Sequence, residues 1–583
     1  MNKQVLGLVL LTLFVSIAII GVFFREHVRP ADQSVISNLP ATFSIHANID
    51  ESAASPIHFT TVPARESGLS FEYYGNPSDE HYMTEQNGGG VALFDADGDG
   101  RLDIFLANGS HFRRPAESVG ASHRLFRQID DWQFQDITVS AGLQSYGFGQ
   151  GCAAGDYDND GFCDLFVAHY GGSRLWHNNG DGTFADATHD SGLGNDQWAS
   201  SAAFADLDDD GYPELYVASY VNWTPESVSS KRIPSPMDFA GLPDLLYKNS
   251  ADGRFQQVGT EAGISIAGEG KGLAVAICDL DGDHLPDIYV ANDTTRNFLF
   301  RNLGGLRFEE CGILRGVAVS QNGSIGSSMG ITIADYNRDG WQDLFVTNFA
   351  EEPLDAFTAI GDSAYVANNA ELGIDRSSKR MLKFGIVLPD FDLDGWPDLF
   401  FANGHLWDDT HAGGEYRMHP SLMRNSGGTR FLDVLRSAGD YFQKKWLGRA
   451  VAWGDLDDDG DADLIVSHLL DPPALLRNDS KRAGNVLRLK LIGVRAARQA
   501  LGTRVEAVVD GRTFVEHVPS GESFQASHDD RVLISLGDAT IINELRVYWS
   551  SQQVETWNNL AASGLVRLVQ GKSTANTAPA RLP

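Results

Sequence analysis

Short apolar stretches, rich in β-branched and aromatic residues, recur in pairs through the middle of the chain, and a polar loop separates the members of each pair. The stretches VALF, SAAFA and LAVAI precede such loops, whereas DIFLA, DLFVA, ELYVA, DIYVA, DLFVT and DLFFA follow them. Apolar runs of this length, bounded by turn-forming residues, predict buried strands. Each unit is therefore expected to contain a strand, a polar loop and a second strand.

Two further strands are predicted in most units. An apolar phrase with an Asn and a Gly-rich turn leads to Phe at 175–184, 246–255, 299–308 and 422–431, which is typical of a hairpin. A strand of the form F-x-D follows, as at 134–143, 184–193 and 431–439. The units begin 50 to 73 residues apart, which suits one four-stranded sheet each. Seven units predict an all-β chain with a seven-bladed β-propeller.

The last unit lacks its Phe-containing strand, and an early copy of that strand occurs before the first unit. The copy lies at 59–69, and the expected strand is missing after 475–478. We expect the early copy to complete the last sheet, closing the ring without an exposed sheet edge between the first and last blades.

The polar loops share one pattern, D-x-[DN]-x-D-G-x-x-[DE], in seven copies. Alternate carboxylates in a tight loop converge, and the carbonyl of position 7 adds an oxygen, which is what a hard cation requires. Calcium suits such a flexible site better than magnesium, so up to seven Ca²⁺ ions are predicted. One Asp- and Gly-rich stretch could be an ordinary turn, but seven in register favour metal binding.

The predicted ligands are these. Position 1 carries Asp95, Asp156, Asp206, Asp279, Asp335, Asp390 and Asp455; position 3 carries Asp97, Asp158, Asp208, Asp281, Asn337, Asp392 and Asp457; position 5 carries Asp99, Asp160, Asp210, Asp283, Asp339, Asp394 and Asp459; position 7, through its carbonyl, carries Arg101, Phe162, Tyr212, Leu285, Trp341, Trp396 and Asp461; position 9 carries Asp103, Asp164, Glu214, Asp287, Asp343, Asp398 and Asp463. His284 replaces the usual glycine of the fourth loop. An EF-hand is excluded because position 12 is apolar in every copy instead of a bidentate Glu.

These loops and their flanking strands resemble FG-GAP and VCBS repeats, the calcium-bearing blades of integrin alpha-subunit propellers. The whole chain resembles the cartilage acidic protein 1 family, in which such a propeller precedes an ASPIC/UnbV domain. The segments 484–493, 501–511, 519–527, 533–539 and 544–551 are similar to that terminal domain. The family's Trp-Pro-Ser-Gly turn reads Trp549-Ser550-Ser551-Gln552 here, which puts any shared ligand of the terminal domain in doubt.

Charge and size agree with an exported acidic protein. The formal net charge is −33, and 27 of the 78 acidic residues occupy carboxylate positions of the loops. Seven divalent ions would bring the formal charge to −19 and relieve repulsion where it is densest. The remaining negative surface disfavours nucleic acid and anionic lipid as partners.

An N-terminal membrane anchor is predicted. The run 5–24 contains no charged residue over 20 positions, which is long enough to span a bilayer, and no small-residue cleavage site follows it. We expect an anchor at 1–28, a linker at 29–56, the propeller at 57–480, the terminal β domain at 484–572 and a disordered tail at 573–583. Weak calcium sites of the extracellular type place the bulk of the chain outside the cytoplasm.

The four cysteines are too few for a disulfide scaffold. Register makes a Cys152–Cys163 bridge unfavourable, and although Cys278 and Cys311 could pair, buried free thiols are expected.

The sequence contains neither H-E-x-x-H nor a phosphate-binding glycine loop. We therefore predict a non-enzymatic scaffold that binds a protein or a glycan. One alternative is a polysaccharide hydrolase or lyase using the segment 404–419, with His405, His411, His419, Asp408, Asp409 and Glu415. Another is an envelope scaffold whose terminal domain docks on the propeller rim. The aromatic residues Phe162, Tyr212, Trp341 and Trp396 could form a carbohydrate platform or pack between blades.

Overall fold

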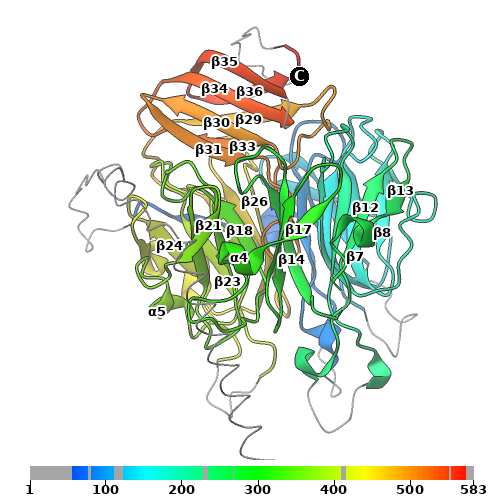
Figure 1. Ribbon diagram of the computed structural model, residues 1–583. Helices are drawn as coiled ribbons and strands as arrows, with labels where there is room; N and C mark the ends of the chain where they lie inside the picture. Colours follow the sequence, from blue (N-terminus) through cyan, green and yellow to red (C-terminus); the bar gives the residue numbers. More distant parts are fainter. Residues whose placement is uncertain are drawn as a thin grey trace, which may run out of the picture. The chain divides into compact units, whose positions relative to one another are not determined.

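The computed structural model describes residues 55–75, 81–110, 122–227, 234–266, 268–408, 415–550 and 553–572. The fold is all-β, as predicted, and its described helices are single turns (Figure 1). The α-helices are α2 (Ala64–Ser67), α3 (Gly259–Ala262), α4 (Gly312–Arg315) and α5 (Asp375–Ser378), and the 3₁₀ turns are η2 (Met83–Glu85), η4 (Pro225–Ser227), η5 (Pro236–Asp238), η7 (Leu435–Ser437) and η8 (Asp440–Gln443).

Seven antiparallel sheets, which we number 1 to 7 after the acidic loop each contains, make up the larger part of the described chain. The strands of sheets 1 to 3 are β2 (Val91–Phe94), β3 (Asp103–Leu106), β4 (Arg124–Asp130) and β5 (Gln133–Asp136); β6 (Phe148–Gly155), β7 (Asp164–Tyr170), β8 (Arg174–Asn178) and β9 (Phe184–Asp186); and β10 (Ala199–Ala205), β11 (Glu214–Ser219), β12 (Leu245–Asn249) and β13 (Phe255–Gln257). Those of sheets 4 to 6 are β14 (Gly272–Cys278), β15 (Asp287–Asn292), β16 (Phe298–Asn302) and β17 (Phe308–Glu310); β18 (Ile331–Ala334), β19 (Asp343–Val346), β20 (Asp355–Ile360) and β21 (Ala364–Ala367); and β22 (Lys383–Val387), β23 (Leu399–Asn403), β24 (Ser421–Asn425) and β25 (Phe431–Asp433).

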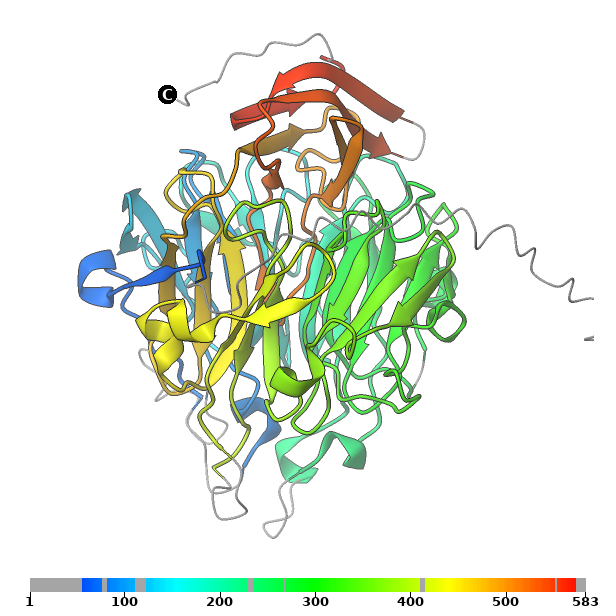
Figure 2. The same ribbon diagram turned by 90° about the vertical axis from the view of Figure 1, so that its left-hand side faces the viewer.

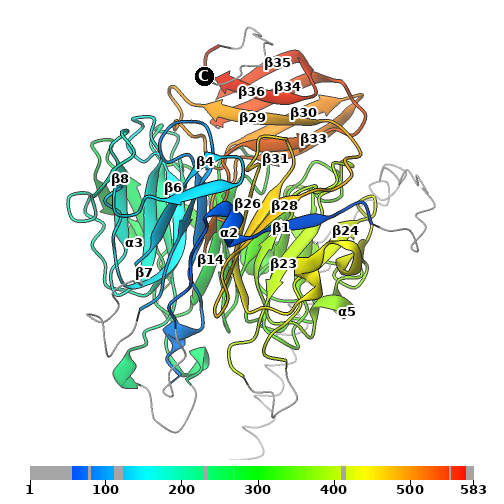
Figure 3. The same ribbon diagram turned by 180° about the vertical axis from the view of Figure 1, so that it is seen from behind.

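Sheet 7 has three strands in sequence and takes its fourth from the start of the described chain. Its strands are β26 (Gly448–Gly454), β27 (Asp463–His468), β28 (Ala474–Asn478) and β1 (Phe59–Val62). β1 pairs antiparallel with β28, so that Phe59 faces Asn478 and Val62 faces Leu475, as Figure 3 shows. The prediction that the early copy completes the last sheet is confirmed.

The seven sheets form a closed ring. The first strand of each sheet lies against the first strand of the next, and β26 of sheet 7 lies against β2 of sheet 1. Each sheet is covered on both faces by its neighbours, so β3, β11 and β15 are buried along their whole length. This explains why the strands appear in the sequence as unbroken apolar runs instead of alternating patterns. A ring of four-stranded sheets is consistent with a β-propeller.

The C-terminal part of the chain forms two further sheets. One contains β29 (Val486–Ile492), β33 (Val532–Ser535) and β36 (Gly564–Val569), and the other β30 (Arg504–Val509), β31 (Arg512–His517), β34 (Ile541–Ser550) and β35 (Gln553–Ala561). Their inward side chains, among them Leu489, Val505 and Trp557, join one buried cluster with Phe204 and Leu215 of sheet 3. The terminal domain and the ring thus share a continuous apolar core.

A segment of the terminal domain, residues 519–529, enters the ring, and we call it the axial segment (Figure 2). It includes β32 (Ala526–Ser527), which pairs in parallel with β2. It makes hydrogen bonds with the first strand of every sheet. The backbone N–H groups of Val91, Ile277 and Ile331 donate to Gln525 O, Ser520 O and Ser523 O, and those of Ala154 and Ile386 donate to the hydroxyls of Ser527 and Ser523. The carbonyls of Phe204 and Trp453 accept from Ser520 Oγ and Asp529 N. These seven distances are 2.8 to 3.2 Å.

The axial segment has an unusual backbone. Glu522, Ser523 and Gln525 have φ values of +72°, +57° and +58°, a left-handed conformation that costs energy for residues other than Gly. The fit is also tight, because a β-carbon on Gly90 of the ring would lie 2.4 Å from Gln525 O. Burial among the seven first strands holds this conformation.

The four cysteines are buried free thiols, as expected. The predicted anchor at 5–24, the linker before residue 55 and the tail lie outside the described residues. Within the described residues, every helix is too short to cross a membrane.

Replacing Phe59 tests the closure of the ring. Its ring is 1% exposed and lies 5.1 Å from Phe391 and 5.8 Å from Phe442, measured between ring centroids. Phe59→Ala should lower the free energy of unfolding by about 3–5 kcal/mol, because it leaves a cavity in sheet 7. Thr60→Ala, at an exposed position of the same strand, is the control for urea denaturation. Equal midpoints for the two variants would contradict a closing role for β1.

Candidate metal centres

Each acidic loop connects the first and second strands of its sheet, so all seven lie at the same end of the ring. In the first loop, Asp95 Oδ1 accepts hydrogen bonds from Gly98 N at 2.8 Å and Asp99 N at 3.1 Å, and Asp95 Oδ2 accepts one from Gly100 N at 2.9 Å. The last of these bonds, from position 6 to position 1, recurs in every loop. Its donors are Gly100, Gly161, Gly211, His284, Gly340, Gly395 and Gly460.

Positions 4 and 6 of every loop have positive φ. At position 6 this explains the glycine of the pattern, because only Gly adopts that conformation at little cost. Position 4 also has positive φ, but its residue type varies from loop to loop, so the sequence pattern does not show this requirement. Its residues are Gly98, Asn159, Asp209, Gly282, Arg338, Leu393 and Asp458, with φ between +56° and +76°.

His284 is the exception at position 6, with φ of +67°. Its ring stacks on Tyr548 of the terminal domain, with centroids 4.2 Å apart and planes 16° apart. The departure from glycine therefore supplies an aromatic contact between the ring and the terminal domain.

The acid at position 9 closes each loop. In the sixth loop, Asp398 Oδ2 accepts from Phe391 N at 3.1 Å and Asp398 Oδ1 accepts from Asn425 N on β24 at 2.8 Å. The corresponding acids accept the same pair of bonds in loops 1, 2, 3, 4 and 7. All seven are buried, and burial raises the pKa of Asp398 and Asp463 well above the usual value. Position 9, predicted as a ligand, thus has a structural role in joining the first three strands.

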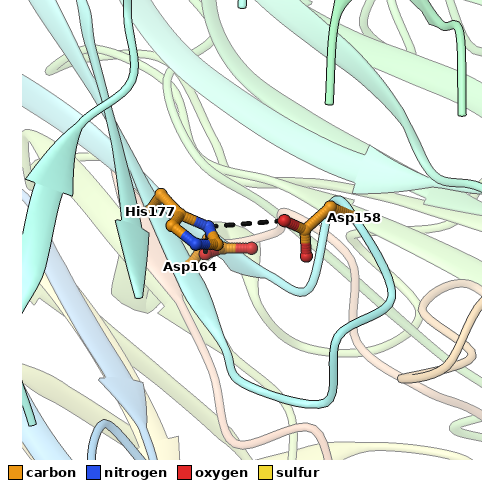
Figure 4. Close-up of side chains that lie close together, drawn as sticks. All are labelled: Asp158, Asp164 and His177. Carbon is orange, nitrogen blue, oxygen red and sulfur yellow. Dashed lines mark ion pairs between the residues drawn. The ribbon is translucent and has the colours of Figure 1, made fainter. Parts of the chain in front are cut away.

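The structure brings predicted carboxylates together, and the position-9 acids Asp164 and Asp287 take part in two of the groups. Ligand atoms lie within 4.8 Å of one another for three sets of positions 1, 3 and 5, in loops 1 to 3, and for Asp279, Asp281 and Asp287 in loop 4. In the second loop, Asp158, Asp164 and His177 also form such a group (Figure 4). The Asp164 carboxylate, with an Nδ1–Oδ1 distance of 3.3 Å, raises the pKa of His177 to about 9.

Several loop carboxylates have a buried oxygen without a hydrogen-bond partner among the described residues. These oxygens are Asp206 Oδ1, Asp208 Oδ1, Asp343 Oδ2, Asp392 Oδ1, Asp455 Oδ1, Asp457 Oδ1 and Asp461 Oδ1. Burial, with the charges of neighbouring carboxylates, raises the pKa of Asp390 and Asp461 to about 8. Buried anionic oxygens left unpaired are costly, and a hard divalent cation satisfies several at once. The residues present therefore fit a divalent ion.

Asp461 has a side chain that the sequence prediction did not use. It was expected to contribute only its carbonyl, as position 7 does in the other loops, but its side chain is 2% exposed and one of its oxygens is among those without a partner. The seventh loop consequently has a fifth carboxylate available to a cation.

Sequence reasoning missed a set of ties between sheets. The Asn of the hairpin phrase donates from Nδ2 to the carbonyl of position 2 in the preceding sheet's loop, as Asn178 does to Ala96 O at 2.9 Å. Every junction has an equivalent. The others are Asn249 to Tyr157 O, Asn302 to Leu207 O, Asn425 to Tyr336 O, Asn478 to Phe391 O, Gln128 to Leu456 O and Tyr365 Oη to Leu280 O. The fixed place of this Asn in the repeat was the available signal.

The terminal domain contacts the loops directly. Asn159 of loop 2 accepts from Arg498 N at 2.9 Å, and Arg338 of loop 5 pairs with Glu516 at 2.8 Å. In loop 7, Arg488 lies 2.6 Å from Asp455. The acidic end of the ring is thus covered by the chain itself.

Two other predicted groups have separate explanations. Trp396 packs on Gly428, where a β-carbon would lie 2.6 Å from the ring, and Phe162 packs in the same way on Gly180. These contacts favour packing over a carbohydrate platform. His405 Nδ1 accepts from Trp407 N, whereas His419 Nδ1 lies 3.2 Å from Phe442 O, so the two histidines have different partners. His411 and Asp409 lie outside the described residues.

Comparisons with known families agree with the loops and the terminal domain. The FG-GAP-like repeat model matches residues 95–167, 156–217, 279–346 and 390–466, and the ASPIC and UnbV model matches 493–575. The chain is therefore an FG-GAP repeat protein with a C-terminal ASPIC and UnbV domain.

Among proteins of known name, the chain is homologous to cartilage acidic protein 1. It is 26% identical over 238 residues to the proteins of Mus musculus and Homo sapiens, and 27% identical over 236 residues to that of Xenopus tropicalis. Each match covers 40% of this chain and spans 34% of the relative.

Solved structures give weaker matches. An Agrocybe aegerita lectin specific for non-reducing terminal N-acetylglucosamine has a TM-score of 0.37 at 15% identity, covering 66% of this chain and 86% of the lectin. BBS1N in complex with ARL6DN has a TM-score of 0.39 at 10% identity, covering 73% and 97%. We base no argument on these low scores.

Asp398→Asn separates the structural acid from the ligand acids. It replaces one acceptor oxygen with an amide group that faces a backbone N–H, so we expect a loss of about 1–3 kcal/mol in the free energy of unfolding, with or without calcium. Asp394→Asn should instead reduce stability mainly in calcium. Asp252→Asn, on an exposed turn, is the control in urea denaturation. A loss for Asp398→Asn seen only in calcium would contradict the structural assignment.

Proposed function

We propose that the seven sheets are the blades of a calcium-stabilised β-propeller that serves as a binding scaffold outside the cytoplasm. The observation that carries this proposal is the set of buried, unpaired carboxylate oxygens in loops of the FG-GAP pattern. The ions have a structural role: they bind the folded loops and neutralise charge that burial makes costly. The chain is not an enzyme in this proposal. The homology to cartilage acidic protein 1 supports a place outside the cell, and the run 5–24 would be the membrane anchor.

The face opposite the acidic loops is the proposed ligand surface. The terminal domain covers the loop side, and the axial segment fills the centre of the ring. The described parts of the long connections between second and third strands, including 220–227, 234–244, 404–408 and 415–420, lie at the opposite ends of the strands. An aromatic cluster that includes Trp198, Trp223 and Phe384 underlies them. Long loops on a rigid scaffold commonly carry binding sites, and a protein or glycan is the expected ligand.

Calcium removal tests the structural role. At about 2 mM free calcium, a site with a Kd near 10⁻⁴ M contributes about 2 kcal/mol by mass action. Chelation should therefore lower the melting temperature of the purified chain and speed its proteolysis. Addition of magnesium at the same ionic strength is the control. A melting temperature that is unchanged in excess chelator would contradict the proposal.

The ligand face is tested by capture from cell envelopes and by glycan arrays. Trp407, half-buried on the 404–420 connection beside His81 at 4.5 Å between centroids, is the variant position. Trp407→Ala should reduce binding at least several-fold without changing the melting temperature. Ile541→Ala, an exposed apolar residue of the terminal domain, is the matched control. Loss of binding in Ile541→Ala but not in Trp407→Ala would place the ligand on the other side.

A further inference from the structure

A basic residue on the third strand of most sheets contacts the acidic loop of the same sheet. Arg301 Nε lies 2.6 Å from Asp281 Oδ2, and Arg424 Nε lies 2.6 Å from Asp392 Oδ2. Three other sheets repeat this contact to the Oδ2 atom of position 3. The pairs are Lys248 with Asp208, Arg127 with Asp97 at 3.4 Å and His177 with Asp158 at 3.4 Å.

The contact uses one carboxylate oxygen and leaves the other. The Oδ1 atoms of Asp208 and Asp392 are buried and have no hydrogen-bond partner among the described residues, although their Oδ2 atoms are paired with Lys248 and Arg424. Asp392 itself is fully buried. In the first, second and fourth loops, Oδ1 of position 3 instead accepts a bond from the backbone N–H of position 5 at 3.3 Å. The basic side chain therefore fixes the rotation of the carboxylate, with Oδ2 held toward the third strand and Oδ1 on the side of the loop.

The fifth sheet lacks both partners together. Asn337 stands at position 3, and Thr358 stands where the other sheets have the basic residue. The strand register shows the equivalence. Phe357, which precedes Thr358, pairs with Leu344, just as Phe300, which precedes Arg301, pairs with Ile288. The loss of the carboxylate coincides with the loss of its basic partner. The joint loss indicates that the basic residue is present because of the carboxylate at position 3, and not because every sheet needs it.

The seventh sheet keeps the contact but changes its donor. Its third-strand residue, Arg477, pairs with Asp479 outside the loop at 2.9 Å. Asp457 Oδ2 instead accepts a hydrogen bond from Trp132 Nε1 of sheet 1, also at 2.9 Å, and Asp457 Oδ1 has no hydrogen-bond partner among the described residues. A donor to Oδ2 of position 3 is thus retained even where the basic residue points elsewhere.

We propose that the third-strand basic residue is a positioning residue for ion binding: by holding Oδ2 of position 3, it presents Oδ1 to the cation in the loop. This inference rests on the proposed ion binding. Hydrogen bonds that orient a metal ligand lower the cost of ordering it, and their loss commonly weakens metal affinity 10- to 100-fold.

Charge alone predicts the opposite effect. A cation beside the loop repels a second cation, so its removal should strengthen calcium binding if it only balances charge. If the residue positions the carboxylate, its removal weakens binding despite the more negative loop. The sign of the change therefore distinguishes the two roles.

The experiment counts calcium ions bound per full-length chain over a range of free calcium, by equilibrium dialysis with elemental analysis. Arg424→Gln should lose about one ion at concentrations that saturate the unchanged protein, because one site weakens roughly 10- to 100-fold. Arg477→Gln, at the equivalent position but paired outside the loop, should keep the full number. Arg424→Lys should retain binding, since Lys248 makes the same contact in sheet 3.

Two outcomes distinguish the proposals. If the unchanged chain binds no calcium, the proposed ion binding is wrong. If the unchanged chain binds calcium and Arg424→Gln binds it equally or more tightly, the positioning role is overturned.

The fifth loop offers a test that adds a carboxylate and its basic partner. It gives up two native contacts, Asn337 Nδ2 to Asp339 Oδ2 at 3.0 Å and Thr358 Oγ1 with Tyr336 Oη at 2.9 Å. Asn337→Asp adds a carboxylate at position 3 without a partner, and Thr358→Arg then supplies the partner. The double variant should bind the fifth ion more tightly than Asn337→Asp alone, although it carries one more positive charge. Weaker binding by the double variant would overturn the proposal, and near-ultraviolet circular dichroism checks that both variants are folded.

Discussion

The ring depends on one buried carboxylate per sheet, the acid at position 9. In six of the seven sheets its two oxygens accept backbone N–H groups from the start of the loop and from the third strand, so one side chain joins three strands. In the fifth sheet Asp343 Oδ1 accepts from Ala359 N on the third strand, and Asp343 Oδ2 has no hydrogen-bond partner among the described residues. A backbone amide buried without an acceptor costs free energy comparable to a lost hydrogen bond, and a neutral side chain offers fewer acceptors. The loop is thereby held in a shape that gathers the remaining acids. The same burial makes their charge costly, which is the physical basis for attracting a cation.

A second set of hydrogen bonds joins neighbouring sheets to one another at the same end of the ring. The third-strand amide of one sheet binds a carbonyl in the loop of the sheet before it, and this tie closes from sheet 1 back to sheet 7 through Gln128. The acidic loops, whose conformation gathers the carboxylates, are therefore mechanically connected to the contacts between sheets. The axial segment adds a third set of bonds at the centre, so the terminal domain is an integral part of the ring and not a separate module on a linker.

The sequence was sufficient for the repeating parts and insufficient for the parts that occur once. Seven aligned loops predicted the strands and the number of sheets, and the displaced copy at 59–69 predicted the closing strand. A weak residue preference becomes recognisable when it recurs at the same position of seven repeats. The axial segment occurs once, and its left-handed residues Glu522, Ser523 and Gln525 carry none of the usual glycine signature. The buried side chain of Asp461 was overlooked because position 7 has no carboxylate in the other loops. The roles of position 9 and of the basic residues required side-chain directions, which spacing alone does not give.

The closing strand has a consequence for the order of biosynthesis. β1 is among the first described residues to leave the ribosome, yet its partner β28 lies about 420 residues later. At a translation rate of about 5–20 residues per second, β1 waits roughly 20 to 80 seconds for that partner. During this interval the incomplete ring has open sheet edges, which can pair with other chains. The ring closes only after β28 has been made.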